Sequence, residues 1–300
     1  MMKMMKMRTM LSTLLLLLQL HPTAPTTPPN TADLMAELRA MGGGAINNLE
    51  DITEAIQVFQ QVQDEFTIEK QLLGTSTDPK TLKFWSALQA IRTKENSMAF
   101  LRSMQNEGRS VKEYHGSNFG YGIVFYTGFE TLIRAVYAAT QRPPPLNIIV
   151  FGSNLGTEVL YLYQLYGHVA QSIVGVEILT QLSSFAHGNA DLHGFPPVLQ
   201  FHCHDALHTD KALLQNSDLI WIDNQVWDVA LNIKMVSMLQ QAPLKKHALI
   251  VDFASFKQAH IHHKFLQASL FEEVTSNEWR LPTSWAGNNP GAGVRVYQVL

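Results

Sequence analysis

Short apolar runs alternate with helix-length segments through the second half of the chain, and this alternation constrains the fold more than any other feature. The apolar runs that indicate strands lie at 146–151, 172–176, 198–201, 219–222 and 248–251. The helix-length segments lie at 158–166, 179–190, 209–215 and 229–241. Strands that are apolar along their whole length and alternate with helices form a parallel sheet covered on both faces. The sequence therefore predicts an α/β fold.

The C-terminal segment departs from this pattern. Residues 271–276 and 294–300 are strand-like, and a connection rich in Gly, Asn and Pro joins them, which indicates an antiparallel pair. Parallel units closed by an antiparallel pair resemble the Rossmann-like sheet of the class I methyltransferases. That sheet is mostly parallel and has an antiparallel last strand, and we expect it here.

The start of the chain has the composition of a leader followed by a linker. Lys3, Lys6 and Arg8 precede an apolar run at 10–20, and residues 1–32 contain no Asp or Glu. A secretory signal has this order, an organellar transit peptide has a similar composition, and a disordered start without a targeting role is the third interpretation. The run is shorter than the roughly 20 apolar residues of a spanning helix, so no membrane span is expected in the mature chain.

Residues 33–115 are expected to form a small helical region before the sheet. A short helix is predicted at 32–41, apolar residues recur at helical spacing over 49–66, and a second periodic stretch runs from Pro79 to Met104. Such stripes are more typical of packing than of a cofactor site. The remaining residues, 116–300, form the predicted methyltransferase-like domain.

The composition excludes two kinds of site. With 22 Lys and Arg against 25 Asp and Glu the net charge is −3, so strong nucleic-acid binding is not expected. Cys203 is the only cysteine, which excludes an internal disulfide and a multi-cysteine zinc site. His202 and His204 would share one face of a strand, which makes a metal there a minor alternative. We expect no metal.

Polar turns follow successive strands of the predicted sheet, at the edge where ligands of open parallel sheets bind. They contain Gly152, Ser153, Asn154 and Gly156 in the first, Glu177 in the second, Asp205 and Ala206 in the third, and Asn224 in the fourth. A glycine turn before a helix lets backbone N–H groups approach a polar ligand, and Asn is able to adopt the left-handed conformation of such a turn. Glu177 is placed to accept from ribose hydroxyls, and Asp205 from an adenine amine.

Together the turns predict an adenosine-bearing cofactor, and we expect S-adenosylmethionine. The first turn lacks the second and third glycines of a G-x-G-x-x-G dinucleotide turn, and Gly156-Thr157-Glu158 lacks the lysine of a P-loop. The acidic side chain of Glu158 beside the turn disfavours a pyrophosphate and tolerates a sulfonium cation. Asn224 is expected to face the reactive end of the cofactor.

The same turns resemble the non-SET histone-lysine methyltransferases named for disruption of telomeric silencing. Val-Phe-Gly-Ser-Asn-Leu-Gly-Thr at 150–157 is similar to that family's Asp-Leu-Gly-Ser-Gly-Val-Gly-Gln, and Gly-Val-Glu-Ile at 175–178 is similar to its Gly-Ile/Val-Glu-Ile. His-Asp-Ala-Leu at 204–207, Ile-Asp-Asn-Gln-Val-Trp at 222–227 and Thr-Ser-Trp at 283–285 resemble its later motifs. Tyr121-Gly122 resembles the start of its segment that helps close over the cofactor.

This resemblance, which covers 116–300, implies a protein-lysine N-methyltransferase. It implies Asn224 and Tyr121 as catalytic residues, Trp285 beside the substrate channel, a histone as protein acceptor, and a nuclear location in place of the secretory pathway or organelle that the leader indicates. The alternative hypothesis is a catalytically degenerate cofactor-binding fold that acts as an interaction module.

Four positions depart from the family's pattern. In the first turn, Val150 replaces the family's Asp and Asn154 replaces its middle Gly. Ile123 replaces the Glu that follows Tyr-Gly, and Asp223 replaces the first Asn of the fourth turn. The long basic arm with which family members hold nucleosomes is also absent. Methyl transfer therefore remains the expected chemistry, with less support for a histone in particular.

Overall fold

The computed structural model describes residues 64–95, 97–111, 113–114, 123–224, 227–253, 270–274, 279–283 and 287–300. The expected leader, the expected helix at 32–41, most of the one at 49–66, Tyr121 and Trp285 lie outside these residues. Within the described ranges, no helix is long and apolar enough to cross a membrane.

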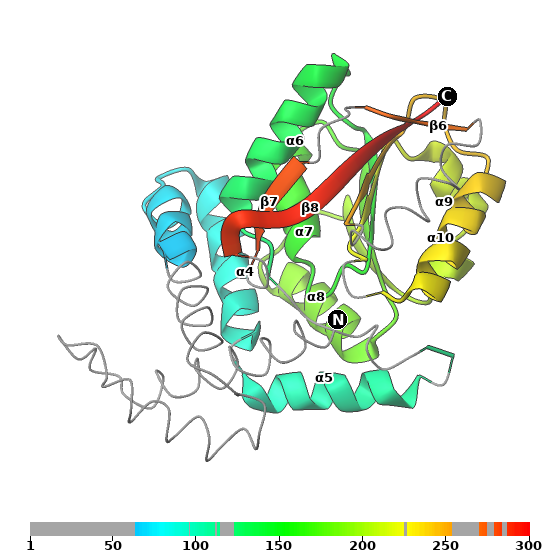
Figure 1. The fold of residues 1–300 in the computed structure, drawn as a ribbon. Coiled ribbons are helices and arrows are strands. Elements are labelled where there is room, and N and C mark those ends of the chain that lie inside the picture. The colour runs from blue at the N-terminus through cyan, green and yellow to red at the C-terminus, as the bar shows by residue number, and fades with distance from the viewer. Residues whose placement is uncertain are drawn as a thin grey trace.

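A mixed β-sheet forms the centre of the structure (Figure 1). Its strands are β1 (Asn147–Phe151), β2 (Ser172–Glu177), β3 (Leu199–Cys203), β4 (Leu219–Ile222), β5 (Leu249–Asp252), β6 (Phe271–Glu273), β7 (Trp279–Thr283) and β8 (Gly287–Val299). The hydrogen-bonded order is β3-β2-β1-β4-β5-β8-β6. Strands β1 to β5 are parallel, and β8 runs antiparallel to β5 and β6. The predicted α/β class, with its antiparallel last strand, is confirmed.

Helices cover both faces of this sheet. They are α4 (Pro79–Glu95), α5 (Met98–Ser110), α6 (Tyr126–Thr140), α7 (Thr157–Tyr166), α8 (Thr180–Leu192), α9 (Lys211–Asn216) and α10 (Val229–Gln241). In Figure 1, α6 and α7 lie on one side of the sheet, and α9 and α10 lie on the other. Residues 64–73 are also helical and precede α4.

The central strands are apolar over most of their length because each face of the sheet has its own core. Ile148 and Val150 of β1 pack in one hydrophobic cluster, and Ile149 and Phe151 pack in the other. All four side chains are fully buried, since successive side chains of a strand point to opposite faces. This double burial is the pattern from which the parallel sheet was predicted.

The helices that precede the sheet share one of these cores. Phe84, Leu88 and Ile91 of α4 have no exposed surface, and they belong to the same cluster as Val150 of β1 and Val159 of α7. The periodic apolar residues of α4 are therefore packing residues of the sheet's own core.

The periodic stretch predicted from Pro79 to Met104 forms two helices. The first, α4, ends at Glu95, and α5 starts after Ser97, whose side-chain oxygen accepts from Phe100 N at 3.3 Å. Serine is a favoured N-cap because its oxygen satisfies an N–H of the first helical turn. Apolar spacing does not detect such a cap, so the break was missed.

Strand β7 has no counterpart among the predicted strands. It pairs antiparallel with β8, with a register shift between Leu281 and Thr283, and it contains Pro282. Proline has no N–H to donate and is tolerated in a sheet at edges and bulges. The proline and the nearby glycines favour a loop when the sequence is considered alone. These residues form a strand because they pair with β8.

Gly156 shows how closely the elements pack at the start of α7. Its φ is 88°, and an added Cβ would lie 2.8 Å from Phe201 Cε1 and 3.2 Å from Ala186 Cβ. We expect Gly156→Ala to lower the free energy of unfolding by about 1–2 kcal/mol, because a left-handed backbone costs that much with a Cβ. Urea denaturation measures the change.

Gly188→Ala is the control for this prediction. Gly188 lies inside α8 and an added Cβ there meets nothing within 4 Å. That variant should gain roughly 0.5–1 kcal/mol, the usual preference for Ala over Gly in a helix. Equal changes in the two variants would contradict the prediction.

Candidate functional site

The strand order reverses between β1 and β4, and the candidate site lies where these two strands end. Asp223 N donates to Phe151 O at 2.9 Å, which holds the two strand ends together. A Cβ on Gly152 would lie 2.9 Å from Asp223 O, so glycine is required at this approach. Ligands of open α/β sheets bind in the crevice at such a reversal.

The turn after β1 has a left-handed backbone at Gly152, Asn154 and Gly156, with φ of 70°, 50° and 88°. The expectation that Asn154 turns the chain in this way is confirmed. The N–H groups of Gly152 and Ser153 both donate to Val176 O, at 3.0 and 3.1 Å. The turn is therefore fixed to the end of β2.

The side chain of Asn154 crosses the crevice. Its Nδ2 donates to Gly152 O and to Asp223 Oδ2, each at 2.9 Å. One amide group thus joins the turn after β1 to the residue that follows β4.

Glu177 ends β2 beside this turn and is only 6% exposed. Its Oε2 accepts from Asn154 N at 3.1 Å, and its Oε1 accepts from Leu179 N at 2.9 Å. Burial raises the pKa of Glu177 to about 7, although the backbone N–H donors, Leu179 first, oppose the rise. A carboxylate offers about four lone-pair positions, so it has capacity for further donors.

Glu158 is a second buried carboxyl beside the turn. It lies in the first turn of α7, is 2% exposed, and its Oε2 has no hydrogen-bond partner. Burial first, and then the charge of Asp223, raises the pKa of Glu158 well above its usual value. The site therefore combines two buried acidic groups, and burial raises the pKa of both.

Asp205 is held by one contact within its own turn and by one contact from a distant part of the chain. Its Oδ1 accepts from Leu207 N at 2.9 Å, at the start of the short 3₁₀ helix Ala206–His208, and its Oδ2 accepts from the Tyr114 hydroxyl. Lys234 Nζ of α10 lies 5.8 Å from the centroid of the Tyr114 ring. Sequence reasoning missed Tyr114, because no local pattern pairs it with a residue so far along the chain.

Helix α5 contacts the neighbouring strand end. Glu107 accepts from Thr180 N at 2.8 Å and from Gln181 N at 3.3 Å, at the start of α8. A carboxylate stabilises a helix N-terminus because the first N–H groups carry partial positive charge. Glu107 thus attaches α5 to the start of α8, close to the end of β2, and Tyr114 is attached beside the end of β3.

We expect Tyr114→Phe to lower the free energy of unfolding by about 1 kcal/mol. The variant removes a half-buried hydrogen bond to a carboxylate, and a single hydrogen bond is worth roughly that much. Urea denaturation at pH 7 measures this change in the free energy of unfolding. Tyr163→Phe on α7 is the control, because it removes a hydroxyl elsewhere. If Tyr114→Phe lost no more stability than this control, the hydrogen bond to Asp205 would contribute nothing to stability.

Asn224 is buried, with 1% exposure. Its Nδ2 donates to Asn232 Oδ1 at 2.6 Å, and its Oδ1 accepts from Phe253 N at 3.0 Å. The side chain thus joins the segment after β4 to α10 and to the residue after β5. These contacts give Asn224 a structural role, and its catalytic role stays a prediction.

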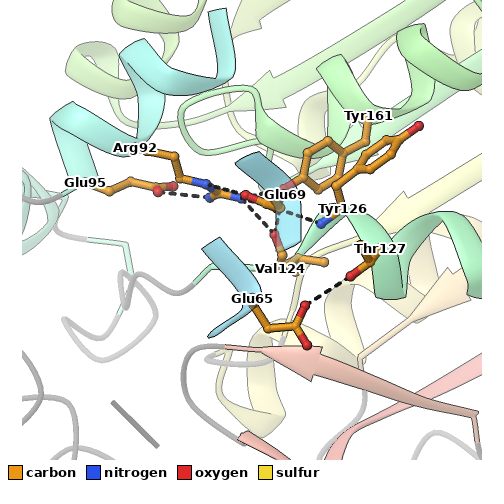
Figure 2. Close-up of polar contacts among 8 residues, drawn as sticks. All are labelled: Glu65, Glu69, Arg92, Glu95, Val124, Tyr126, Thr127 and Tyr161. Atoms are coloured by element: carbon orange, nitrogen blue, oxygen red, sulfur yellow. Dashed lines mark hydrogen bonds and ion pairs between the residues drawn. The ribbon is translucent and has the colours of Figure 1, made fainter. Parts of the chain in front are cut away.

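A buried charged network fixes the helix that begins at the site (Figure 2). Arg92 of α4 pairs with Glu69 and Glu95 at 3.0 Å each, and Arg92 Nη2 lies 2.5 Å from the Tyr161 hydroxyl. Tyr161 and Glu158 belong to the same helix, α7. The network therefore attaches residues 64–73 and α4 to the element that carries Glu158.

His202 and His204, the alternative metal site, lack a third ligand among the described residues. Their ring centroids are 5.9 Å apart, and burial lowers the pKa of His202. Within the ranges that the structure describes, no three His, Cys, Asp or Glu side chains are grouped to hold a metal ion.

No family model matches this sequence, and no curated protein matches it. A methyltransferase from Geobacter sulfurreducens aligns with a TM-score of 0.45 at 14% identity, over 78% of this chain and 97% of that one. The O-methyltransferase from Bacillus cereus in complex with S-adenosylhomocysteine (SAH) aligns with a TM-score of 0.44 at 15% identity, over 66% of this chain and 90% of that one. Magnesium protoporphyrin IX methyltransferase from Synechocystis PCC 6803, with bound S-adenosylmethionine, aligns with a TM-score of 0.42 at 16% identity, over 75% of this chain and 98% of that one. At these TM-scores, the fold is assigned from this chain's own strand order.

Proposed function

We propose that this chain is a methyltransferase that binds S-adenosylmethionine in the crevice between β1 and β4. The observation that carries the proposal is the position of Glu177. This buried carboxylate ends the strand next to the left-handed glycine turn, at the reversal of strand order. A carboxylate there is suited to accept from the two ribose hydroxyls of a nucleoside.

The donor and acceptor set of the site fits such a cofactor. Glu177 has lone pairs beyond the two that its backbone partners use. Asp223 gives the other side of the turn an acidic character, which suits a cationic ligand and opposes a pyrophosphate. Asp205, which Tyr114 holds in place, is the acceptor available to an adenine amine.

S-Adenosylmethionine, when bound, supplies an electrophilic methyl group. The chain contributes binding and orientation: the turn 152–156 and Glu177 place the nucleoside, and the anchored segment 98–114 lies beside it. Positioning of two reactants contributes several kcal/mol to lowering a barrier, and exclusion of water strengthens the polar contacts. Asp223, which follows β4, is the acidic group nearest to the expected reactive end.

We propose a protein lysine as the acceptor, and this finer assignment is supported by the resemblance to the non-SET histone-lysine methyltransferases. The net charge of −3 favours a free protein over a nucleosome, because each contact to a DNA phosphate needs a cation. Tyr121 and Trp285 remain proposed site residues on the same basis.

Isothermal titration of the full chain with S-adenosylmethionine and SAH tests the cofactor. Binding of both is expected, and no binding of either at millimolar concentration would overturn the proposed function. Labelled cofactor with free histones, nucleosomes and small amines then tests the acceptor. We expect labelling of free protein above nucleosomes at about 0.15 M salt. Binding without labelling of any acceptor would support the interaction-module hypothesis.

A further inference from the structure

The amide of Asn154 bridges the segments that follow β1 and β4. Its Nδ2 stands between Gly152 O on one wall and Asp223 Oδ2 on the other, at 2.9 Å from each. A ligand group that binds to both acceptors in the same way has to displace this amide.

The two acceptors form a site for a positively charged nitrogen. A carbonyl and a carboxylate that converge on one nitrogen suit an ammonium group, because hydrogen bonds with ionised partners are the stronger ones. Glu158 Oε2, a further buried polar atom of the site, has no hydrogen-bond partner among the described residues. In this structure the neutral amide of Asn154 takes the place of that cation.

Glu177 gives the amide a fixed position. The N–H of Asn154 donates to Glu177 Oε2 at 3.1 Å, and the residue has a φ of 50°. The backbone is thus held in place, and the side-chain hydrogen bonds of Asn154 to other described residues are those that its amide group donates. Rotation of the side chain would remove its hydrogen bonds to Gly152 O and Asp223 Oδ2 without moving the backbone of the turn.

We propose that Asn154 is a specificity-determining residue whose side chain competes with the ammonium group of the ligand's amino-acid end for Gly152 O and Asp223. The inference rests on the proposed function and adds to it a residue that sets how strongly the amino-acid end is bound. Ligand binding then requires displacement of the amide, and the affinity is lowered by the two hydrogen bonds that are lost.

The experiment compares two ligands that differ in the amino-acid end. SAH carries the ammonium group, whereas 5′-methylthioadenosine keeps the adenine, the ribose and the sulfur but lacks it. Titrations of both ligands are measured with the wild-type chain and with Asn154→Gly, because glycine accepts the left-handed backbone. For SAH we expect the affinity of Asn154→Gly to rise about tenfold, which corresponds to about 1.4 kcal/mol. The affinity for methylthioadenosine is expected to change by less than about twofold.

Gln141→Gly is the control, since Gln141 also has a left-handed backbone, with a φ of 51°, and lies after α6. It should leave both affinities unchanged. Equal changes for the two ligands in Asn154→Gly, or weaker SAH binding, would overturn the inference, because Asn154 would then act only on the shape of the turn. Failure of the wild-type chain and the variant to bind either ligand would instead overturn the proposed function.

Discussion

Replacing Arg92 with Met is expected to lower the free energy of unfolding by about 3–5 kcal/mol, the usual cost of removing one partner of a buried ion pair. The variant leaves the carboxyl groups of Glu69 and Glu95, whose side chains are 0% and 2% exposed, without their cation. Methionine retains much of the length of the arginine side chain, so the loss reports mainly the uncompensated charge. Urea denaturation of the full chain at pH 7 measures it.

The structure offers a control on another helix, α6. Arg134 pairs with Glu130 on α6, and the Arg134 side chain is 68% exposed. Arg134→Met should therefore cost less than about 1 kcal/mol, because exposed ion pairs contribute little. Addition of Glu69→Gln to Arg92→Met should recover part of the loss, since it removes one buried charge. A loss in Arg92→Met no larger than in the control would show that the network does not stabilise α7.

Replacing Glu177 with Ala is expected to weaken SAH binding by about 10- to 150-fold, since hydrogen bonds to a charged group are worth roughly 1.5–3 kcal/mol. The variant removes the acceptor assigned to the ribose hydroxyls. It also removes the acceptor of Asn154 N and Leu179 N, so its folding is checked by circular dichroism before titration.

Two further variants separate the binding effect from general damage. Glu177→Gln keeps an oxygen that is able to accept from one backbone N–H, and its affinity should fall between those of wild type and Glu177→Ala. Glu272→Ala removes an exposed carboxylate on β6 and should leave the affinity unchanged. Wild-type affinity in a folded Glu177→Ala would exclude Glu177 from the site.

The pKa of Glu177 makes SAH binding depend on pH. Burial raises this pKa from its usual 4.5 to about 7. The ionised carboxylate is the better acceptor for two hydroxyls, so the affinity should rise as the pH increases from about 6 to about 8, on either side of that pKa. For the unliganded protein the sign is opposite: the folded state binds the proton more tightly, so stability falls as the pH rises from 4.5 toward 7. Both dependences should weaken in Glu177→Ala.

Much of the fold could be predicted because strands that are buried on both faces appear in the sequence as short apolar runs. The strand at 219–222 and the helix at 229–241 were predicted with the bounds that the structure has, and β1, β2, β3 and β5 differ from the predicted ranges by one or two residues at one or both ends. Most of the core-facing residues of these elements are apolar. By contrast, β7 depends on its partner β8, and a strand that exists through pairing leaves a weak local pattern.

The candidate site was predictable only in outline. Glycine and acidic residues at strand ends are local features, so Gly152, Gly156 and Glu177 were identified from their order along the chain. The contact between Tyr114 and Asp205 is not local, and neither is the bridge from Asn154 to Asp223. Partners that meet across the sheet share no spacing that a sequence pattern is able to detect.

The sequence by itself determined the α/β class, the parallel order of units with an antiparallel end, and the edge of the sheet where the polar turns gather. These follow from hydrophobic periodicity and from backbone conformations that only certain residues adopt. The tertiary structure alone decided which polar atoms are already used: Asn224 is turned toward Asn232 and Phe253, and Asn154 crosses the crevice. The reason is physical, since burial and hydrogen-bond partners arise from chain segments that meet only in the folded protein, and these set both the pKa of Glu177 and the atoms that remain for a ligand.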